Sequence, residues 1–146
     1  MIYTTYLKKL KDIKLNDNDI IVFCGKYLPG DKEAFVLKEK FSDEIELHFD
    51  VGLERNIWLY KALAPSFDAY AIYRNTKQNT VLLNNMSEIV NFSSKVQDML
   101  KNLVKKFNIK GKNCYLVGLY KDSTKCHRSV LSGYINEKLK AIVTEI

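Results

Sequence analysis

Proline and glycine are scarce in this sequence, and neither residue gathers in one place. The chain of 146 residues has two prolines, Pro29 and Pro65, and six glycines. It contains no tract rich in proline, glycine or serine, no low-complexity segment and no internal repeat. Linkers between domains and repeat architectures carry such features. Because 47% of the residues are apolar, which is enough for a core, we expect residues 1–146 to form a single domain.

Long apolar runs are also missing. No stretch approaches the roughly 18 consecutive apolar residues that a membrane-spanning helix requires. The opening MIYTTYLKKLKDIK lacks the charged start, apolar stretch and small residues of a signal peptide, in that order. We therefore expect a soluble, cytoplasmic protein without a membrane partner, and the sequence makes no prediction of its oligomeric state.

Cysteine and histidine are few. The three cysteines, Cys24, Cys114 and Cys126, are an odd number and show no Cys-x-x-Cys spacing, and His48 and His127 are the only histidines. These counts argue against a disulfide framework and against a zinc site. The sequence therefore predicts reduced thiols, no metal and no cofactor, with Cys114 as an inert thiol inside an apolar run.

Positive charge is confined to one part of the chain. Residues 1–100 hold 13 lysines and arginines against 14 acidic residues, whereas residues 101–146 hold 10 against 3. The whole net charge of +6 therefore comes from the last third. Such an excess forms either a solvated lysine-rich helix face or a field that attracts anions, and the sequence leaves both interpretations open.

Several short apolar segments have the composition of strands. The segment DIIVFC is continuous and rich in β-branched residues, as in a strand buried on both faces, and EIELHFDV alternates like a half-exposed strand. His48 lies on the polar side of the second segment, so we expect it to face solvent. The predicted strands lie near residues 1–5, 20–24, 44–50 and 113–119, with a last one in 141–146.

Helical periodicity separates these strands. The predicted helical segments are a turn within 6–13, then 31–41, 54–74 with an interruption at Pro65, 87–107, and 129–139. The aromatic side chains of 54–74 suit core packing or a wall for a planar ligand. A capping box of Ser94 and Gln97 would start the long helix later than residue 87. Alternating strands and helices predict an α/β protein: one three-layer, Rossmann-like domain on a mainly parallel sheet.

The segment KDSTKCHRS, residues 121–129, leaves a predicted strand and enters a helix. Ligands of parallel sheets bind beyond the carboxyl ends of the strands, where helix N-termini offer unpaired N–H groups. Arg128 adds a planar set of donors suited to phosphate or carboxylate. Its neighbours add further donors: Ser123, Thr124, His127 and Ser129. The segment thus predicts a small cradle for an anion.

Cys126 lies in the same positive field, which favours thiolate over thiol and lowers the pKa. The sequence therefore predicts a nucleophile at Cys126, with Arg128 holding the attacked anion. The spacing is not that of tyrosine phosphatases or rhodaneses, because Ser132 stands where those loops place arginine. The alternative is structural: a partly buried cysteine, a capping His127 and a surface Arg128.

Two other strand ends should reach the same edge of the sheet. Thr4 and Thr5 close the first predicted strand, and Lys26 follows the second. Because parallel strands end on the same side, we expect all three residues beside the Cys126 turn, as further ligand-binding groups.

Three segments together resemble the domain-of-unknown-function family numbered 488, in its short form common in phages and bacteria. IYTTYLKKL is similar to the family's opening strand and helix, and YKALAPSFD resembles its Tyr-Lys-Lys-Leu-Ala-Pro segment. CHRSVLSGYI resembles its Cys-His-Arg signature, read onto Cys126, His127, Arg128 and Leu131. The resemblance spans nearly the whole chain and implies a Rossmann-like α/β fold. It implies no particular activity.

The chain departs from the family pattern in two places. The family often ends the preceding strand in Cys-x-Glu, where this chain has Gly118, Leu119 and Tyr120. We therefore expect Arg128 to lack an acidic partner. The family's Arg-x-x-Pro begins with Lys26 here, which keeps the charge and loses the bidentate geometry. Both departures weaken the prediction of turnover and leave that of anion binding intact.

These observations support three hypotheses. The first is a pocket for a small anionic, phosphorylated, nucleotide-like ligand, which the protein modifies through Cys126 or sequesters. The second is nucleic-acid binding by the basic last third, weak and lost near physiological salt. The third is a redox-responsive thiol, which needs a second cysteine near Cys126. Under the first hypothesis, replacing Arg128 by lysine should weaken anion binding more than folding.

Overall fold

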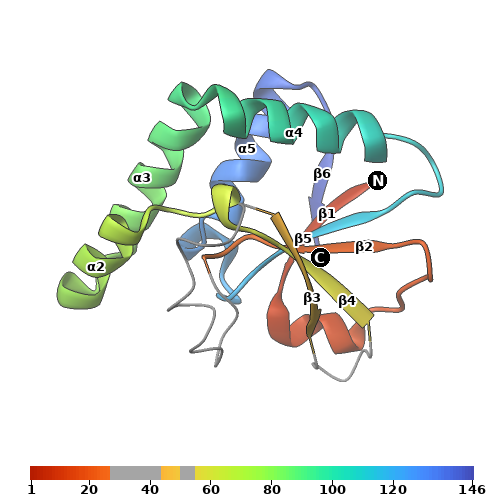
Figure 1. Ribbon diagram of the computed structural model, residues 1–146, viewed down its shortest axis with the longest axis horizontal. Helices are drawn as coiled ribbons and strands as arrows, with labels where there is room; N and C mark the ends of the chain where they lie inside the picture. Colours follow the sequence, from red (N-terminus) through yellow and green to blue (C-terminus); the bar gives the residue numbers. More distant parts are fainter. Residues whose placement is uncertain (27–43, 50–54) are drawn as a thin grey trace.

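The computed structural model describes residues 1–26, 44–49 and 55–146. These residues form one six-stranded sheet with helices on its faces (Figure 1). The strands are β1 Ile2–Tyr6, β2 Ile20–Phe23, β3 Glu44–Phe49, β4 Arg55–Tyr60, β5 Cys114–Gly118 and β6 Val143–Glu145. The α-helices are α2 Phe67–Thr76, α3 Asn79–Phe92, α4 Ser94–Phe107 and α5 Arg128–Lys138. Three 3-10 helices complete the set: η1 Leu7–Asp12, η2 Lys61–Leu63 and η3 Ser123–Lys125.

The sheet is mainly parallel, as predicted. Its order is β3-β4-β2-β5-β1-β6, and β3 alone pairs antiparallel, with β4. The predicted strands at 1–5, 20–24, 44–50, 113–119 and within 141–146 are all present. The α/β class is therefore confirmed. Whether the domain is Rossmann-like is a finer question than its α/β class, and that part stays a prediction.

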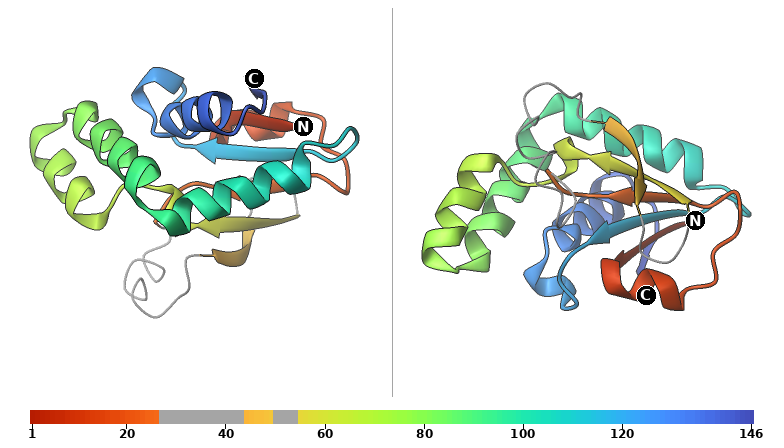
Figure 2. Two further views of the ribbon diagram at one scale, coloured as in Figure 1. Left: turned by 90° about the horizontal axis from the view of Figure 1, so that it is seen from above. Right: turned by 60° about the horizontal axis from the view of Figure 1, so that its bottom comes forward.

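Each face of the sheet carries its own apolar cluster. On one face α3, α4 and α5 pack on side chains such as Val22 and Leu116, which are fully buried. On the other face η1 packs on Ile21, Phe23 and Val117 through its buried Leu10. Figure 1 shows η1 below the sheet and α4 above it. Seen from above, α4 and α5 lie across the same face, and α2 and α3 stand at the end toward which β5 points (Figure 2).

The start of one predicted helical segment, 54–74, is wrong. Residues 55–60 form strand β4, not the start of a helix, because Ile57 and Leu59 point into one cluster while Trp58 packs against the other. A strand buried on both faces shows no polar alternation that would reveal it. The predicted helix 31–41 lies outside the described residues.

The long helix predicted at 87–107 is two helices, α3 and α4. The backbone of Ser93 is extended between them, and its hydroxyl oxygen accepts the Val96 N–H at 3.3 Å. The capping residue is therefore Ser93, one position before the Ser94 of the predicted capping box. Gln97 does not close that box, because its side-chain amide donates to the carbonyl of Val90 at 3.0 Å. The cap lets α4 turn away from α3 and lie across the sheet.

Candidate functional site

The Cys-His-Arg segment lies where it was predicted, between the end of β5 and the start of α5. Cys126 follows the last residue of η3, His127 precedes the first residue of α5, and Arg128 is that first residue. All three side chains are buried, with exposed fractions of 1%, 6% and 0%. These three residues therefore belong to the interior of the protein, whereas Lys121, Asp122, Thr124 and Lys125 of the same turn are exposed.

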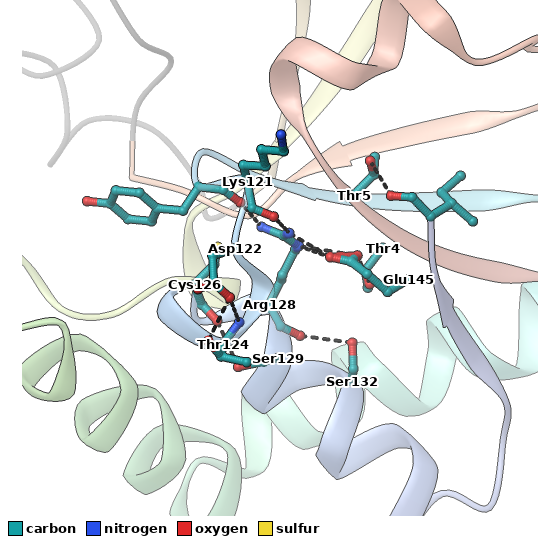
Figure 3. A network of polar contacts seen from close by, with 12 residues as sticks. Thr4, Thr5, Lys121, Asp122, Thr124, Cys126, Arg128, Ser129, Ser132 and Glu145 are labelled. Carbon is teal, nitrogen blue, oxygen red and sulfur yellow. Dashed lines mark hydrogen bonds and ion pairs between the residues drawn. The ribbon is translucent and has the colours of Figure 1, made fainter.

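The Arg128 guanidinium binds protein groups on every side (Figure 3). Its Nε lies 2.7 Å and its second terminal nitrogen 2.6 Å from Oε1 of Glu145. Its two terminal nitrogens also donate to the backbone carbonyls of Tyr120 and Lys121. Oε2 of the same carboxylate accepts the hydroxyl of Thr4 at 2.8 Å. We call these five residues the Arg128 cluster; it ties the loop after β5 to β1 and β6.

The expectation that Arg128 lacks an acidic partner is therefore wrong. Sequence reasoning placed the acid at the end of β5, whereas Glu145 reaches Arg128 from β6, 17 positions further along the chain. The pairing depends on β6 lying next to β1, which no local pattern reveals. Thr5 also joins the C-terminal strand, since its hydroxyl donates to the carbonyl of Ile146 at 3.1 Å. The structure thus directs Thr4, Thr5 and Arg128 toward β6 and its end.

The Cys126 thiol occupies the place of an anion at the N-terminus of α5. Burial by itself raises the pKa of this thiol, but the His127 side chain, the Arg128 backbone N–H and the Arg128 guanidinium outweigh it and lower the pKa to about 6. The sulfur lies directly over Gly118, where a Cβ would approach it to 2.3 Å. The positive groups that sequence reasoning assigned to a ligand therefore stabilise the thiolate.

Two of the three predicted hydroxyls, those of Thr124 and Ser129, serve the turn itself. Thr124 donates to Asp122 Oδ1 at 2.6 Å, and Ser129 donates to the carbonyl of Cys126 at 2.9 Å. The backbone carbonyl of Ser123 accepts the N–H of Cys126 at 3.1 Å. None of the three lies among the described residues that line the neighbouring pocket. They hold the backbone shape that presents the Cys126 thiol to α5.

A pocket of about 80 Å³ opens beside the turn, at the carboxyl ends of β2 and β5. We call it the His127 pocket. Its described lining residues are Phe23, Cys24, Gly25, Lys26, Tyr70, Leu119, Tyr120 and His127. This is the edge at which parallel sheets bind ligands. Aromatic rings from β2, α2 and the loop after β5 make up much of the wall. Tyr70 belongs to the segment 54–74, for which the sequence left open a wall for a planar ligand. Phe23 and Tyr120 were missed because they come from two other segments.

His127 separates this pocket from the buried thiol. Its Nε2 lies 2.6 Å from the carbonyl oxygen of Cys24, an acceptor, so Nε2 carries a proton and donates. The same ring makes the side-chain hydrogen bond that favours the Cys126 thiolate. The imidazole therefore bridges the exit of β2 and the sulfur.

Lys26 lies in the same pocket as His127, as predicted. Its ammonium donates to the carbonyl of Lys61 at 2.7 Å and lies 5.5 Å from the centre of the Phe67 ring. Burial, together with the charges of Lys61 and Lys95, lowers the pKa of Lys26 to about 8. Burial also lowers the pKa of Lys61, a residue only 3% exposed. We call Lys26, Lys61 and Lys95 the lysine cluster.

Tyr120 completes the rim. Its hydroxyl donates to that of Tyr73 in α2 at 3.0 Å, which links the loop after β5 to the helix beside the pocket. Burial and this hydrogen bond raise the pKa of Tyr120 well above its ordinary value, so the phenol stays neutral. Its backbone carbonyl meanwhile binds Arg128. One residue thus belongs to both the pocket and the Arg128 cluster.

Comparison with known proteins gives no further guide. No protein-family model matches the chain, and no curated protein and no solved structure matches it either. Across residues 1–26, 44–49 and 55–146, no group of three or more His, Cys, Asp or Glu side chains could hold a metal ion. The helices in the same ranges are too short or too polar to cross a bilayer.

Proposed function

We propose that the protein binds a small anionic, phosphorylated, nucleotide-like ligand in the His127 pocket. The observation that carries this proposal is Lys26, a cation in the wall of the pocket. The charges of Lys61 and Lys95 act on it and help to lower its pKa. The same positive field attracts an anion that enters the pocket beside Lys26.

The walls of the pocket suit a planar or sugar-like group next to the anion. Phe23, Tyr70 and Tyr120 supply aromatic surface, and aromatic faces stack on flat rings. A cavity of about 80 Å³ holds one compact head group, so the rest of a nucleotide would extend outward past Leu119, which is 51% exposed. Aromatic surface and cation together favour a nucleotide-like ligand over a bare inorganic ion.

Of the two fates proposed for the ligand, geometry favours sequestration over modification by Cys126. The sulfur is 1% exposed and is not one of the described lining residues of the pocket. A nucleophile must come within about 3.5 Å of the atom it attacks. Cys126 instead fixes His127, and Arg128 fixes the loop that carries Tyr120.

Calorimetric titration of the whole chain with adenosine monophosphate and with ribose 5-phosphate tests the proposal. Lys26→Met should weaken binding about tenfold or more, since a contact to a charged group contributes roughly 1.5 to 3 kcal/mol. Lys101→Met, on the exposed side of α4, should leave the affinity unchanged. Cys126→Ser should spare binding, because the sulfur does not line the pocket.

Two results would contradict the proposal. The first is that neither compound binds, and the second is that Lys26→Met and Lys101→Met lose affinity equally. Equal losses with a steep dependence on salt would promote the basic last third as a nucleic-acid-binding surface instead. A urea titration of each variant separates loss of binding from loss of folding.

A further inference from the structure

Lys26 differs chemically from an ordinary surface lysine. Lys26 is one of the residues that line the pocket, its nitrogen is held by the 2.7 Å hydrogen bond to the Lys61 carbonyl, and the charges of Lys61 and Lys95 act on it. That acceptor is an uncharged carbonyl, which holds the nitrogen in place without requiring its positive charge. An amine desolvated beside other cations is the arrangement that makes lysine a nucleophile at neutral pH.

We propose that Lys26 forms an imine with the open-chain aldehyde of a free sugar phosphate such as ribose 5-phosphate. This compound has the sugar and phosphate of a nucleotide, and because no base is bonded to its anomeric carbon, its ring can open to an aldehyde. This inference rests on the proposed function, because it assigns the ligand of the His127 pocket to a chemical class. The positive field around Lys26 favours the phosphate, and Lys26 attacks the carbonyl carbon.

The step balances without an added reagent. The lone pair of the neutral Nζ attacks the aldehyde carbon, and the carbonyl oxygen takes up a proton to give a carbinolamine. The carbinolamine loses its hydroxyl group as water, and a carbon–nitrogen double bond forms in place of the carbon–oxygen bond. One molecule of water leaves for each imine. Protonation of the imine restores the positive charge that the site had before the reaction.

Protonation explains the selectivity. With a pKa of about 8, half of Lys26 is the neutral amine at pH 8. In an ordinary lysine of pKa about 10.4, the neutral fraction at the same pH is on the order of a hundredfold smaller. Its lower basicity makes the amine a weaker nucleophile and offsets part of this advantage. We expect Lys26 to react at least about tenfold faster than any other described lysine.

Reductive trapping tests the inference. The whole chain is incubated with ribose 5-phosphate at pH 8, reduced with cyanoborohydride and analysed by intact mass and peptide mapping. One adduct should form, on the peptide that contains Lys26. Lys26→Arg keeps the charge and should abolish the adduct, and Lys101→Arg should leave it unchanged. Labelling at Lys26 should level off above pH 8.5, whereas surface lysines continue to rise.

Ribitol 5-phosphate, which lacks a carbonyl, separates this inference from the proposed function. If it binds the pocket while ribose 5-phosphate gives no adduct, the imine is refuted and the anion pocket stands. If neither compound binds, both proposals fall. Adducts spread over many lysines of the wild-type chain also refute the imine, and that result needs no variant to fold.

Discussion

Replacing Glu145 by glutamine should destabilise the protein far more than its place in a short terminal strand indicates. Arg128 is fully buried, so loss of the carboxylate leaves a buried cation without a counter-charge. Breaking such a pair costs about 3 to 5 kcal/mol when both partners are buried. The Glu145 side chain is 38% exposed, so water screens part of the charge. We expect a loss of about 2 to 3 kcal/mol.

The contacts of Glu145 support this magnitude. Its carboxylate accepts two short bonds from the guanidinium, at 2.7 and 2.6 Å, and one from Thr4 at 2.8 Å. Glutamine offers one oxygen in place of two, so at least one buried donor loses its acceptor. An unsatisfied buried donor alone costs about 1 to 3 kcal/mol. The two lines of reasoning thus give overlapping ranges.

The assay is urea unfolding followed by circular dichroism, with Glu137→Gln as the matched control. Glu137 is an exposed glutamate on α5, and its replacement should change the free energy of unfolding by less than about 0.5 kcal/mol. Arg128→Lys should cost about as much as Glu145→Gln, because one ammonium cannot reach the carboxylate and both carbonyls. This expectation reverses the one from sequence, in which that variant mainly weakens anion binding. A loss below 0.5 kcal/mol for Glu145→Gln would refute the reasoning.

Three further predictions concern the turn and the helices. Gly118→Ala should lower the free energy of unfolding by about 1 to 3 kcal/mol, because the new Cβ would lie 2.3 Å from the Cys126 sulfur. Gly133→Ala, whose Cβ would have no atom within 4 Å, should stabilise α5 by about 0.5 to 1 kcal/mol. Urea unfolding measures both changes. The ultraviolet absorbance of the Cys126 thiolate should titrate near pH 6. The free energy of unfolding should rise with pH between about 6 and 9, by at most about 1.4 kcal/mol per pH unit, because the unfolded chain binds the proton that the folded chain has lost. A flat stability profile, or a profile that is unchanged in Cys126→Ser, would count against the thiolate. Ser93→Ala should cost about 1 kcal/mol in thermal or urea unfolding and Ser94→Ala much less, and the opposite order would show that the cap is misplaced.

Local signals predicted most strands of this fold. Apolar, β-branched runs such as 20–24 and 113–119 can be buried on both faces in only a few ways, and the structure has them in parallel. Strand β4 was missed because its aromatic residues also fit a helical period, and the tertiary environment decides between the two. The sequence offered Ser94 as the cap of the later helix, one position after the actual cap Ser93, because two serines stand side by side. Which serine caps the helix, and whether 55–60 is a strand, depend on contacts with the rest of the fold.

The candidate site was predicted only in part for the same reason. The sequence shows a strand followed by a helix, with Cys126 just before the helix. This order predicted the position of the turn and the lowered pKa of the thiol. The partners of Arg128 come from β6 and from backbone carbonyls, and sheet order alone brings Glu145 within reach. Lys61 and Lys95 join Lys26 from segments far apart in sequence. Residue types therefore predicted an anion site at Arg128, whereas in the fold protein groups occupy that guanidinium, and the anion site that we propose depends on Lys26 instead.

The most direct test of the central claim is a chemical-shift map of the whole, isotopically labelled chain titrated with ribose 5-phosphate at physiological salt. If the His127 pocket binds the anion, the backbone amides of Gly25, Lys26 and His127 should shift together and saturate along one binding curve. Shifts confined to Lys101 and Lys105 of α4, or the absence of saturable shifts around the pocket, would contradict the account.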